Sequence, residues 1–498
     1  MTSISWSGKI YKGGANSGWI TIPLNLRKYV KLEHWYNVQI NTKNKITLNT
    51  TLCLKKLKSS WGFYIKKRIC EINQLIGQNV TVIISPSEFF QRKISAYKSI
   101  RLPKSIVKIK GIKKFDIYEV EVEVYSRTYR EIVLISVIDR STRTSADEYY
   151  FTLRLTDVHK AKEAKVRLLR KIEKIDAYEK KNSKKEIYLP NLFPEAIIGK
   201  IDDRQMIIFD GNHTPVITPI IINIEEFIHY FGCYHADGTK SSFGWSINAS
   251  TPEQAHYYIL TYKKIVLNPK LSFELSYSKK PSNVENYLIT TDILIKYWKK
   301  NASIQLKTDK IRIKEARSEK IKKWNPYGSI RIRDFRSIVL KLHLRIHNKI
   351  LDHLKNEMKL QQLWLFLFGV LEGDGYVAGG KNRFGIGFAT NIDDNIISEF
   401  LNKLKIKYTI DDSRIKKGLG KGLQIRICLN QVLKNLPAIS ENIFKYYPKR
   451  RMMFIKRLIN KPSVKKLLES NIHLENKDTK KESIECLLKL KKELEKIK

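Results

Sequence analysis

Short runs in the first 150 residues have the β-branched residues or the alternation of apolar and polar positions that are typical of strands. The runs at residues 19–22, 38–40, 80–84 and 118–124 are rich in β-branched residues or alternate cleanly. From about residue 221 the pattern changes to longer apolar stretches with helical spacing, separated by short alternating segments. We therefore expect a β-rich N-terminal module at residues 1–150, followed by an α+β region.

A weak internal repeat runs through the N-terminal module. Its units span residues 19–40, 63–84 and 99–124, and each predicts a strand, a basic helical turn and a second strand. Pro23 and Pro103 are equivalent and lie 80 residues apart, which corresponds to two periods of about 40 residues. The middle unit departs from this pattern because Lys66 stands where proline is expected.

The first repeat unit resembles the AbrB-type swapped-hairpin DNA-binding domain, and the third unit fits the same pattern. The matching residues are Ile20, Thr21, Ile22, Pro23, Leu26, Arg27, Leu32 and Val38 in the first unit, and Leu102, Pro103, Lys104, Ile112 and Val120 in the third. The resemblance implies two hairpins that interlock into one DNA-binding body, which tandem units could build within one chain. A generic small β-domain is the alternative interpretation.

Two further segments are dominated by charge. Residues 151–220 are expected to form a charged helical connector, because the stretch from Lys160 to Lys181 is strongly charged and four prolines follow it. Residues 461–498 are expected to form a charged helical tail, with leucines at helical spacing near the end.

The charge balance indicates a polyanionic partner. The 498 residues include 93 Lys and Arg against 49 Asp and Glu, which gives a formal net charge of +44. Nucleic acid is the plain interpretation of such an excess, and a basic membrane-surface protein is the alternative.

We find no apolar run of about 18 residues, so we expect no membrane span. The N-terminus has no apolar signal core, so we expect a cytoplasmic, organellar or nuclear protein that is not secreted. The five cysteines form no CxxC pair, which argues against a zinc site and a disulfide scaffold.

Two similar segments carry the candidate chemistry, at residues 230–238 (YFGCYHADG) and 367–375 (LFGVLEGDG). Each is an apolar helix that ends at Asp-Gly, and each has two small residues four positions apart on one helix face. Packing through these faces would place Asp237 beside Asp374. Two carboxylates at helix C-termini oppose the helix dipole and repel each other, and a divalent cation relieves both effects. Oxygen ligands favour Mg²⁺ (or Mn²⁺) over zinc. A plain helix-stop turn is the alternative for a single Asp-Gly, but the duplication favours a site.

These two motifs resemble those of the LAGLIDADG homing endonucleases in their single-chain form, over about residues 220–460. The resemblance implies a pseudo-two-fold pair of αββαββα halves at residues 221–355 and 356–460, with antiparallel sheets that bind the DNA major groove. It implies that Asp237 and Asp374 bind the metals, together with the backbone carbonyls of Ala236 and Gly373. His235 departs from the pattern where the family often has a carboxylate, which Glu372 keeps.

The sequence around the motifs fits these halves. After the second motif we expect a hairpin at residues 376–390, a helix at 393–404 and a second hairpin at 407–429. After the first motif we expect a strand at 243–247 and a helix that begins at Thr251-Pro252-Glu253-Gln254. The resemblance implies further catalytic residues: Asn248 and Asn391 to order water, Lys449 as the basic residue of the second half and Lys341 as that of the first. Taken alone, a strand-end turn residue or a solvated surface lysine is the commoner interpretation of each.

The predicted function is site-specific double-strand cleavage of DNA by a monomer that binds a long asymmetric target. Residues expected to contact double-stranded DNA from the hairpins are Lys240, Arg331, Arg333, Tyr376, Lys381, Arg383, Arg414, Lys416 and Arg426. An RNA-binding intron maturase and a non-catalytic DNA-binding regulator on the same scaffold are the alternatives, and a basic scaffold protein without a site is a third. The duplicated aspartates favour the enzyme, because a pure binder needs no paired metal carboxylates.

Overall fold

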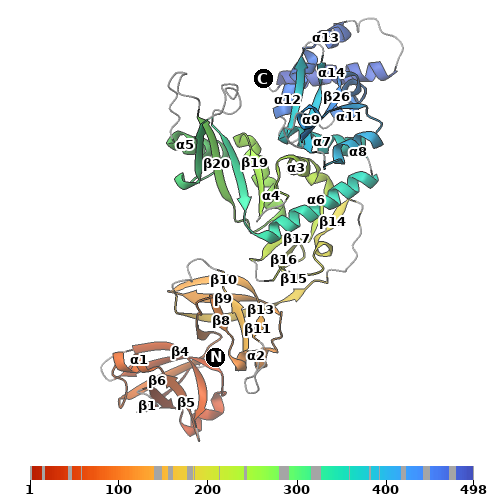
Figure 1. The fold of residues 1–498 in the computed structure, drawn as a ribbon. Coiled ribbons are helices and arrows are strands. Elements are labelled where there is room, and N and C mark those ends of the chain that lie inside the picture. Colours follow the sequence, from red (N-terminus) through yellow and green to blue (C-terminus); the bar gives the residue numbers. More distant parts are fainter. Residues whose placement is uncertain are drawn as a thin grey trace. The chain divides into compact units, whose positions relative to one another are not determined.

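The computed structural model divides into two compact units, the first at Met1–Ile175 with Gly199–Ile201 and the second at Asp176–Ile198 with Asp202–Lys498 (Figure 1). It describes residues 3–13, 17–42, 47–57, 59–138, 148–154, 161–176, 183, 185–211, 214–240, 244–279, 291–315, 327–357, 359–380, 383–391, 393–416, 422–440, 443, 449–469 and 478–496.

A closed six-stranded barrel opens the first unit. Its elements are β1 (Ile4–Lys12), β2 (Gly18–Thr21), the 3-10 helix η2 (Leu24–Tyr29), β3 (Trp35–Thr42), β4 (Thr47–Leu57), β5 (Ser60–Ile65), α1 (Lys67–Ile72) and β6 (Asn79–Pro86). The strand order is β1-β2-β5-β4-β3-β6. Exchanging β1, β2 and β3 for β4, β5 and β6 leaves every pairing unchanged. The barrel is therefore a pseudo-two-fold body made from two copies of one strand–strand–helix–strand unit.

The same pairings recur in the rest of the first unit. Its elements are β7 (Phe90–Lys93), β8 (Ser99–Arg101), α2 (Lys104–Lys110), β9 (Ile117–Val124), β10 (Arg127–Leu134), β11 (Ser136–Ile138), β12 (Glu148–Thr152) and β13 (Glu163–Lys174). Here β8 pairs with β12, β9 with β13, β13 with β7 and β10 with β9. The Ile94–Ile100 bridge joins β7 to β8, and β11 pairs with β12. This second body is interrupted between β10 and β11, but its connectivity is that of the barrel.

The predicted repeat is present in three dimensions. The residue before each short helix is Pro23 (φ −52°, ψ 147°), Lys66 (φ −59°, ψ 143°) or Pro103 (φ −60°, ψ 138°). Lys66 thus adopts the backbone conformation that proline imposes at the other two positions. The middle unit, which departs in sequence, is the pseudo-two-fold partner of the first.

The predicted charged helix between Lys160 and Lys181 is wrong over its central part, and the first unit extends beyond the expected boundary at residue 150 to Ile175. Residues Glu163–Lys174 form strand β13, with Ala164, Val166 and Leu168 buried on one face. The cations on its other face oppose the acidic residues of β9 and its start: Lys165 pairs with Glu123, Arg167 with Glu121, Arg170 with Glu119 and Lys171 with Asp116. Charge complementarity between strands, rather than helical spacing, accounts for this density of charge.

The second unit begins with short strands and continues into two helix–sheet halves. The leading elements are β14 (Glu186–Tyr188), η4 (Leu189–Leu192), β15 (Ile197–Lys200), β16 (Gln205–Phe209), β17 (Val216–Pro219) and β18 (Ile221–Asn223). The last two residues of β15 belong to the first unit. The first half comprises α3 (Ile224–Asp237), β19 (Trp245–Ala249), α4 (Pro252–Ile265), β20 (Ser272–Lys279), α5 (Thr291–Ala302), η5 (Thr308–Lys310), β21 (Ile311–Glu315), β22 (Ser329–Asp334) and α6 (Ser337–Glu357). The second half comprises α7 (Leu360–Gly373), β23 (Gly375–Gly380), β24 (Arg383–Asn391), α8 (Ile396–Lys403), β25 (Tyr408–Asp411), α9 (Ser413–Lys416), β26 (Gly422–Cys428), α10 (Leu429–Lys434) and α11 (Leu436–Ser440).

The two halves contain sheets of related connectivity. The second sheet has the order β23-β24-β26-β25 and is antiparallel throughout. The first has the order β19-β22-β20-β21, in which β21 is parallel to β20, and Gly238 forms a bridge to Ile247 of β19. In both, the strand before the mid-half helix pairs with the last strand of the sheet. The predicted elements of the second half are confirmed; in the first half the predicted strand is shifted to Trp245–Ala249, and Phe243 lies outside the described residues.

Helices α12 (Lys449–Ile459), α13 (Pro462–Glu469) and α14 (Asp478–Lys496) complete the chain. The predicted terminal helix is present, and Ile484, Leu487 and Leu490 are buried along one side of it. These side chains make α14 part of the packed unit. No helix in the part of the chain that the structure describes is long and apolar enough to cross a lipid bilayer.

Candidate active site

Helices α3 and α7 contact each other backbone to backbone. A β-carbon added to Gly232 would lie 2.2 Å from the carbonyl oxygen of Phe366, and one added to Gly369 would lie 2.1 Å from that of His229. Both distances are far below van der Waals contact, so only glycine fits at either position. The small-residue faces expected from the spacing therefore meet in the helix pair.

This packing brings the two acidic helix ends together. A β-carbon added to Gly373 would lie 2.4 Å from the Ala236 Cβ and 3.0 Å from Oδ2 of Asp237. Asp237 thus lies against the residue that precedes Asp374 in the chain. Asp374 is the exposed C-cap of α7, and its amide donates to the Val370 carbonyl. The predicted neighbours Asp237, Ala236, Gly373 and Asp374 form one small region where α3 and α7 end.

The local chemistry suits a hard cation. Both carboxylates lie at helix C-termini, where the dipole presents partial negative charge. The lack of a side chain at Gly373 lets the Asp237 carboxylate approach the end of α7 closely, because a β-carbon there would lie only 3.0 Å from Oδ2 of Asp237. Asp237 also helps raise the pKa of Tyr258, although burial of that phenol is the larger cause. Within the described ranges, no group of three or more His, Cys, Asp or Glu side chains is arranged to hold a metal. A site here would depend on the two aspartates and backbone oxygens.

The two asparagines lie at similar places in their sheets. Asn248 is an exposed residue near the end of β19, paired with Arg331. Asn391 is the exposed last residue of β24, paired with Gly422. Each lies on the strand that pairs with the last strand of its sheet.

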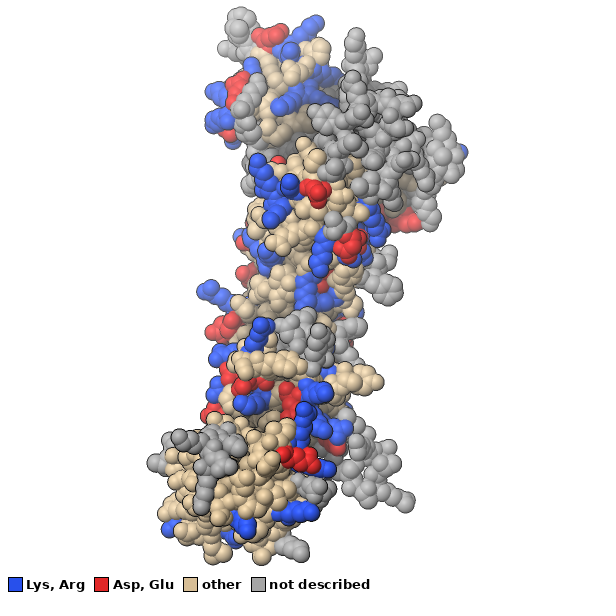
Figure 2. Space-filling model, turned by 90° about the vertical axis from the view of Figure 1, so that its left-hand side faces the viewer, with Lys and Arg blue, Asp and Glu red and all other residues tan. Residues whose placement is uncertain are grey.

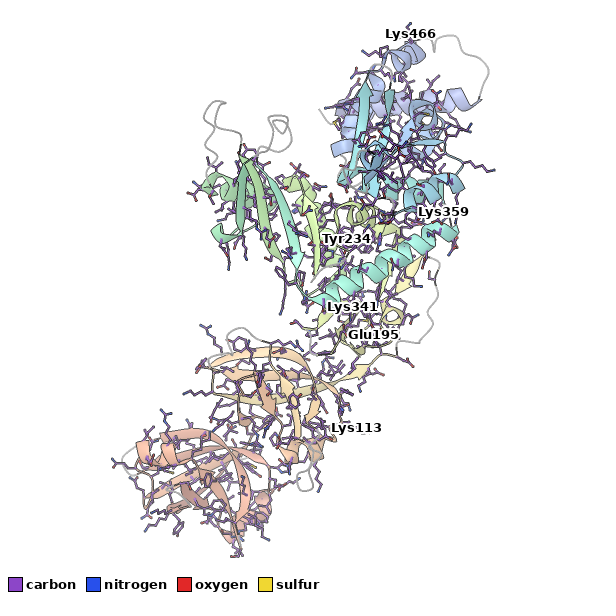
Figure 3. All side chains as sticks on the ribbon, viewed as in Figure 1. Lys113, Glu195, Tyr234, Lys341, Lys359 and Lys466 are labelled. Atoms are coloured by element: carbon purple, nitrogen blue, oxygen red, sulfur yellow. The ribbon has the colours of Figure 1, made fainter. Side chains whose placement is uncertain are left out.

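The two predicted basic residues have different surroundings. Lys341, on α6, forms an ion pair with Asp210 at 2.5 Å. The pKa of Glu195 is lowered chiefly by its hydrogen bond from Arg345, and the charge of Lys341 adds to this effect. Figure 3 shows Lys341 and Glu195 close together in the second unit. Lys449 is the first residue of α12, and its side chain lies outside the described residues. Lys341 is therefore engaged with the segment after β16.

The sheet of the first half presents two arginines on its exposed face. Arg331 and Arg333 alternate along β22 with the buried Ile330 and Ile332. Arg331 donates to Ser246 Oγ at 3.2 Å, and Arg333 donates to Glu274 Oε1 at 2.9 Å. These contacts hold both guanidinium groups over the sheet.

A tyrosine and an arginine meet on the sheet of the second half. Tyr376 on β23, Gly387 on β24 and Arg426 on β26 occupy one row across three strands. A β-carbon on Gly387 would lie 2.2 Å from the Tyr376 ring, so this glycine lets the ring cross the middle strand. Arg426 Nε then donates to the Tyr376 hydroxyl at 2.8 Å, and that hydroxyl donates to Gln424 Oε1 at 3.0 Å.

The other predicted DNA contacts are only partly described. Lys240 lies 3.5 Å from Oδ2 of Asp394, and Lys416 forms an ion pair with Asp412 at 3.0 Å. Lys416 belongs to the short helix α9 rather than to a turn. Lys381 and the side chains of Arg383 and Arg414 lie outside the described residues.

A histidine–aspartate cluster that the sequence did not reveal joins the two halves. His235 Nε2 lies 3.0 Å from Oδ2 of Asp394, and His235 Nδ1 lies 3.3 Å from His347 Nε2. Burial raises the pKa of Asp394, but its hydrogen bond to His235 and the charge of Lys240 outweigh this and hold the pKa well below its usual range. Burial lowers the pKa of His347 to about 3. His235, the departure from the family motif, therefore has a partner in the other half.

Gln254 makes a second link between the halves. Its side chain donates to the Tyr258 hydroxyl at 2.8 Å and to the Glu372 carbonyl at 3.4 Å. Its backbone amide donates to Thr251, as the predicted cap requires, whereas its side-chain oxygen accepts from the Ser250 amide. The capping glutamine thus fixes the start of α4 against the end of α7.

Basic and acidic side chains are intermixed on the face of the molecule that Figure 2 draws. Figure 2 shows Lys and Arg along one face of each unit, with Asp and Glu among them.

No protein-family model matches the chain, and no curated protein does either. Among solved structures, the chain is similar to the crystal structure of I-DmoI in complex with DNA and Ca, with 13% sequence identity and a TM-score of 0.23. The match covers 47% of this chain and 98% of the I-DmoI chain. A superposition with that score does not decide a fold, so the residues and contacts above carry the proposal that follows.

Proposed function

We propose that this chain is a metal-dependent, site-specific DNA endonuclease of the LAGLIDADG type, with its active site where α3 and α7 end. The observation that carries the proposal is the packing of Gly232 against Gly369 and of Ala236 against Gly373, with Oδ2 of Asp237 beside Gly373. A helix-stop turn alone does not require two glycine-faced helices in backbone contact. Such an arrangement has a clear use when both carboxylates must serve one reaction centre.

Asp237 and Asp374 would hold Mg²⁺ or Mn²⁺ together with the carbonyl oxygens of Ala236 and Gly373. Bound beside a phosphodiester, such an ion activates water and stabilises the leaving oxygen. Asn248 and Asn391 are the side chains assigned to order that water. Lys449 and Lys341 are assigned to offset phosphate charge, and Lys341 would first have to exchange its ion pair with Asp210.

The two sheets are the proposed DNA-binding surfaces. Arg331 and Arg333 in one half, and Tyr376 with Arg426 in the other, offer hydrogen-bond donors from exposed sheet faces. The two faces differ in sequence, so they would read different bases of an asymmetric target. One chain contains both halves, so cleavage would not require dimerisation. The pseudo-two-fold barrel of the first unit and the second body of the same connectivity, through their AbrB-like hairpins, would add affinity as a tethered module.

The test is cleavage of a randomised plasmid library with magnesium, followed by sequencing of the cut ends. We expect double-strand breaks at a single long motif. Asp374→Asn should abolish cleavage and retain DNA binding, because it removes charge at the metal site without altering the sheet faces. Asp292→Asn, an exposed acid at the start of α5, is the matched control and should cleave normally. Full cleavage by the Asp237→Asn, Asp374→Asn double variant would exclude the site. Binding to structured RNA without cleavage of any DNA would favour the maturase instead.

A further inference from the structure

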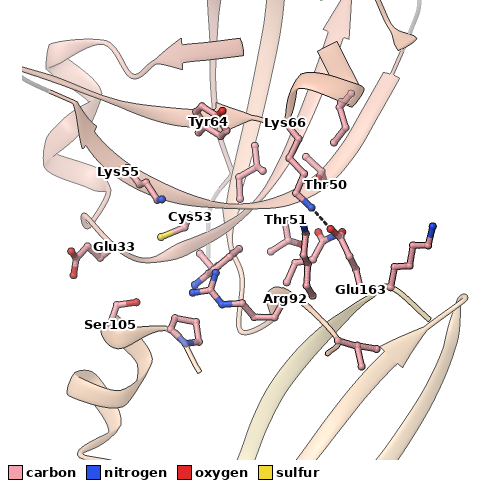
Figure 4. Close-up of a pocket in the computed structure, with 18 of the residues that line it drawn as sticks. Glu33, Thr50, Thr51, Cys53, Lys55, Tyr64, Lys66, Arg92, Ser105 and Glu163 are labelled. Atoms are coloured by element: carbon pink, nitrogen blue, oxygen red, sulfur yellow. Dashed lines mark hydrogen bonds and ion pairs between the residues drawn. The ribbon is translucent and has the colours of Figure 1, made fainter. Parts of the chain in front are cut away.

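A large cleft lies inside the first unit, between the barrel and the second body formed by β7 to β13. It has a cavity volume of about 1750 Å³ and is lined from β3, β4, β5, β7 and the starts of α1 and α2 (Figure 4). Small-molecule sites usually have volumes of about 300–1,000 Å³. The cleft is therefore larger than a single small ligand needs.

The lining of the cleft is strongly basic. Eight cationic side chains face two carboxylates, those of Glu33 and Glu163. The cations are Lys55, Lys56, Lys66, Arg68, Arg92, Lys93, Lys104 and Lys162. Glu163 is already engaged, because Lys66 forms an ion pair with it and Gln91 donates to it at 2.7 Å. The cleft thus presents a large excess of positive charge.

Arg92 is the most informative of these residues. It is only partly exposed, and its guanidinium lies 5.5 Å from the centre of the Trp35 ring. Burial lowers the pKa of Arg92, and the smaller effect of Cys53 opposes this shift. Among the ion pairs that the structure describes, none joins Arg92, Lys93 or Lys162 to a carboxylate. Figure 4 shows the Arg92 guanidinium pointing into the cleft toward Cys53.

We propose that this cleft binds the phosphodiester backbone of a nucleic acid. The partly buried Arg92 guanidinium and the exposed ammonium groups of Lys93 and Lys162, none of which is joined to a carboxylate in a described ion pair, suit phosphate oxygens. The exposed rings of Tyr64 and Tyr125 also line the cleft and offer apolar surface to sugars or bases. The inference deepens the nucleic-acid-binding part of the proposed function and rests on it to that extent. It assigns to the N-terminal unit a contact distinct from the sheets of the second unit.

The test measures the binding affinity of the full-length chain for a fluorescently labelled DNA duplex by anisotropy. The duplex has about 40 base pairs, so that it can engage several phosphate-binding side chains. The cleft variant is Arg92→Gln, Lys93→Gln, Lys162→Gln. The control is Lys108→Gln, Lys110→Gln, Lys113→Gln, which removes the same charge from α2 and the loop after it, outside the cleft. We expect the cleft variant to weaken binding by on the order of tenfold and to reduce the salt slope by about 2 to 3, and the control to change both much less.

A variant that spares Arg92 separates charge from packing. Lys93→Gln, Lys162→Gln changes two exposed side chains and leaves the Arg92–Trp35 stack intact. It should show about two-thirds of the change in salt slope of the triple variant. Equal effects of the cleft and control variants would overturn the proposal, because general electrostatics would then account for the binding.

Alkylation of Cys53, which lines the cleft, reports occupancy directly. Duplex DNA or duplex RNA should slow modification of Cys53 in the parent chain and not in the cleft variant, and comparison of the two assigns the preferred backbone. Protection by inorganic phosphate alone, without protection by either nucleic acid, would overturn the proposal. Magnesium-dependent cleavage by the cleft variant at saturating DNA is measured alongside. Cleavage by the parent chain is measured in the same assay, and its absence would count against the proposed nuclease but leave the Cys53 result unaffected.

Discussion

Gly369 contacts Gly232 so closely that a β-carbon on Gly369 would lie 2.8 Å from the Gly232 Cα and 2.7 Å from the Cys233 amide nitrogen. Because these neighbours are backbone atoms, no side-chain rotation can relieve the overlap. We therefore expect Gly369→Ala to separate α3 from α7. The cost should be about 3 kcal/mol or more of unfolding free energy, at the upper end for overpacked cores. Cleavage should fall with it, because the same interface positions Asp237 and Asp374.

The control for this substitution is Gly77→Ala in the first unit. Gly77 has φ +83° and no atom within 4 Å of an added β-carbon, so alanine there costs only backbone strain of about 1 kcal/mol. Urea unfolding of both variants, followed by tryptophan fluorescence, measures the difference. Equal small losses of stability would contradict the close packing of the two helices.

The Tyr376–Arg426 pair gives a prediction about specificity. The Tyr376 hydroxyl lies 2.8 Å from Arg426 Nε and positions the guanidinium over β26. If Arg426 reads a base edge, Arg426→Ala should relax the preference at one base pair, with a loss of about 1 to 3 kcal/mol of discrimination. Cleavage of single-base target variants measures this preference.

Tyr376→Phe distinguishes positioning from direct contact. It removes the hydroxyl that holds Arg426 and keeps the ring over Gly387. We expect a smaller loss of discrimination at the same base pair. If Arg426→Ala instead weakens all targets equally, Arg426 contacts phosphate and does not read sequence.

The burial of His343 leads to a prediction about how the free energy of unfolding depends on pH. It is fully buried, it stacks on Tyr262 with ring centres 5.4 Å apart, and its Nδ1 donates to the Val339 carbonyl. Burial lowers its pKa from 6.5 to about 4. Between these values the unfolded chain binds a proton that the folded chain does not. The contribution to stability is therefore complete above pH 6.5 and declines as the pH falls toward 4, by at most about 1.4 kcal/mol per pH unit.

His343→Phe should reduce this acid-dependent loss of stability, because the aromatic stack remains and the titrating group is gone. His256→Phe, at an exposed histidine of α4, should leave the slope in place. Unfolding free energies between pH 4 and 7 test the expectation. An unchanged slope in His343→Phe would show that other buried groups, such as His347, dominate.

The close helix pair could be predicted because its signal is local. Small residues four positions apart define a helix face, and their duplication at Gly232 and Gly369 indicated which faces meet. His235 and Asp394 could not be paired in the same way. They belong to different halves, and nothing in the sequence next to either residue indicates that it has a partner in the other half.

Two features of the first unit show why the sequence pattern was incomplete. Lys66 conceals the barrel symmetry, because a residue other than proline adopts φ −59° and ψ 143° there. Strand β13 has a charge density typical of a surface helix, and only its partner β9 explains it: the glutamates of β9 lie opposite the cations of β13. The stabilising partner of such a strand is distant in sequence.

The backbone at Lys66 leads to a prediction about stability. Proline fits the observed φ of −59°, the two equivalent positions are Pro23 and Pro103, and the preceding Ile65 ends a strand, as proline prefers. Lys66→Pro restricts the unfolded chain, but it also loses the partly exposed ion pair with Glu163. Lys66→Ala loses the same ion pair without the restriction, so it is the matched control. We expect the proline variant to be more stable than the alanine variant by about 0.4 to 1 kcal/mol. Amide hydrogen exchange of α1 and β6 in the full-length chain measures this difference, and faster exchange in the proline variant would show that the Lys66 position does not match those of Pro23 and Pro103.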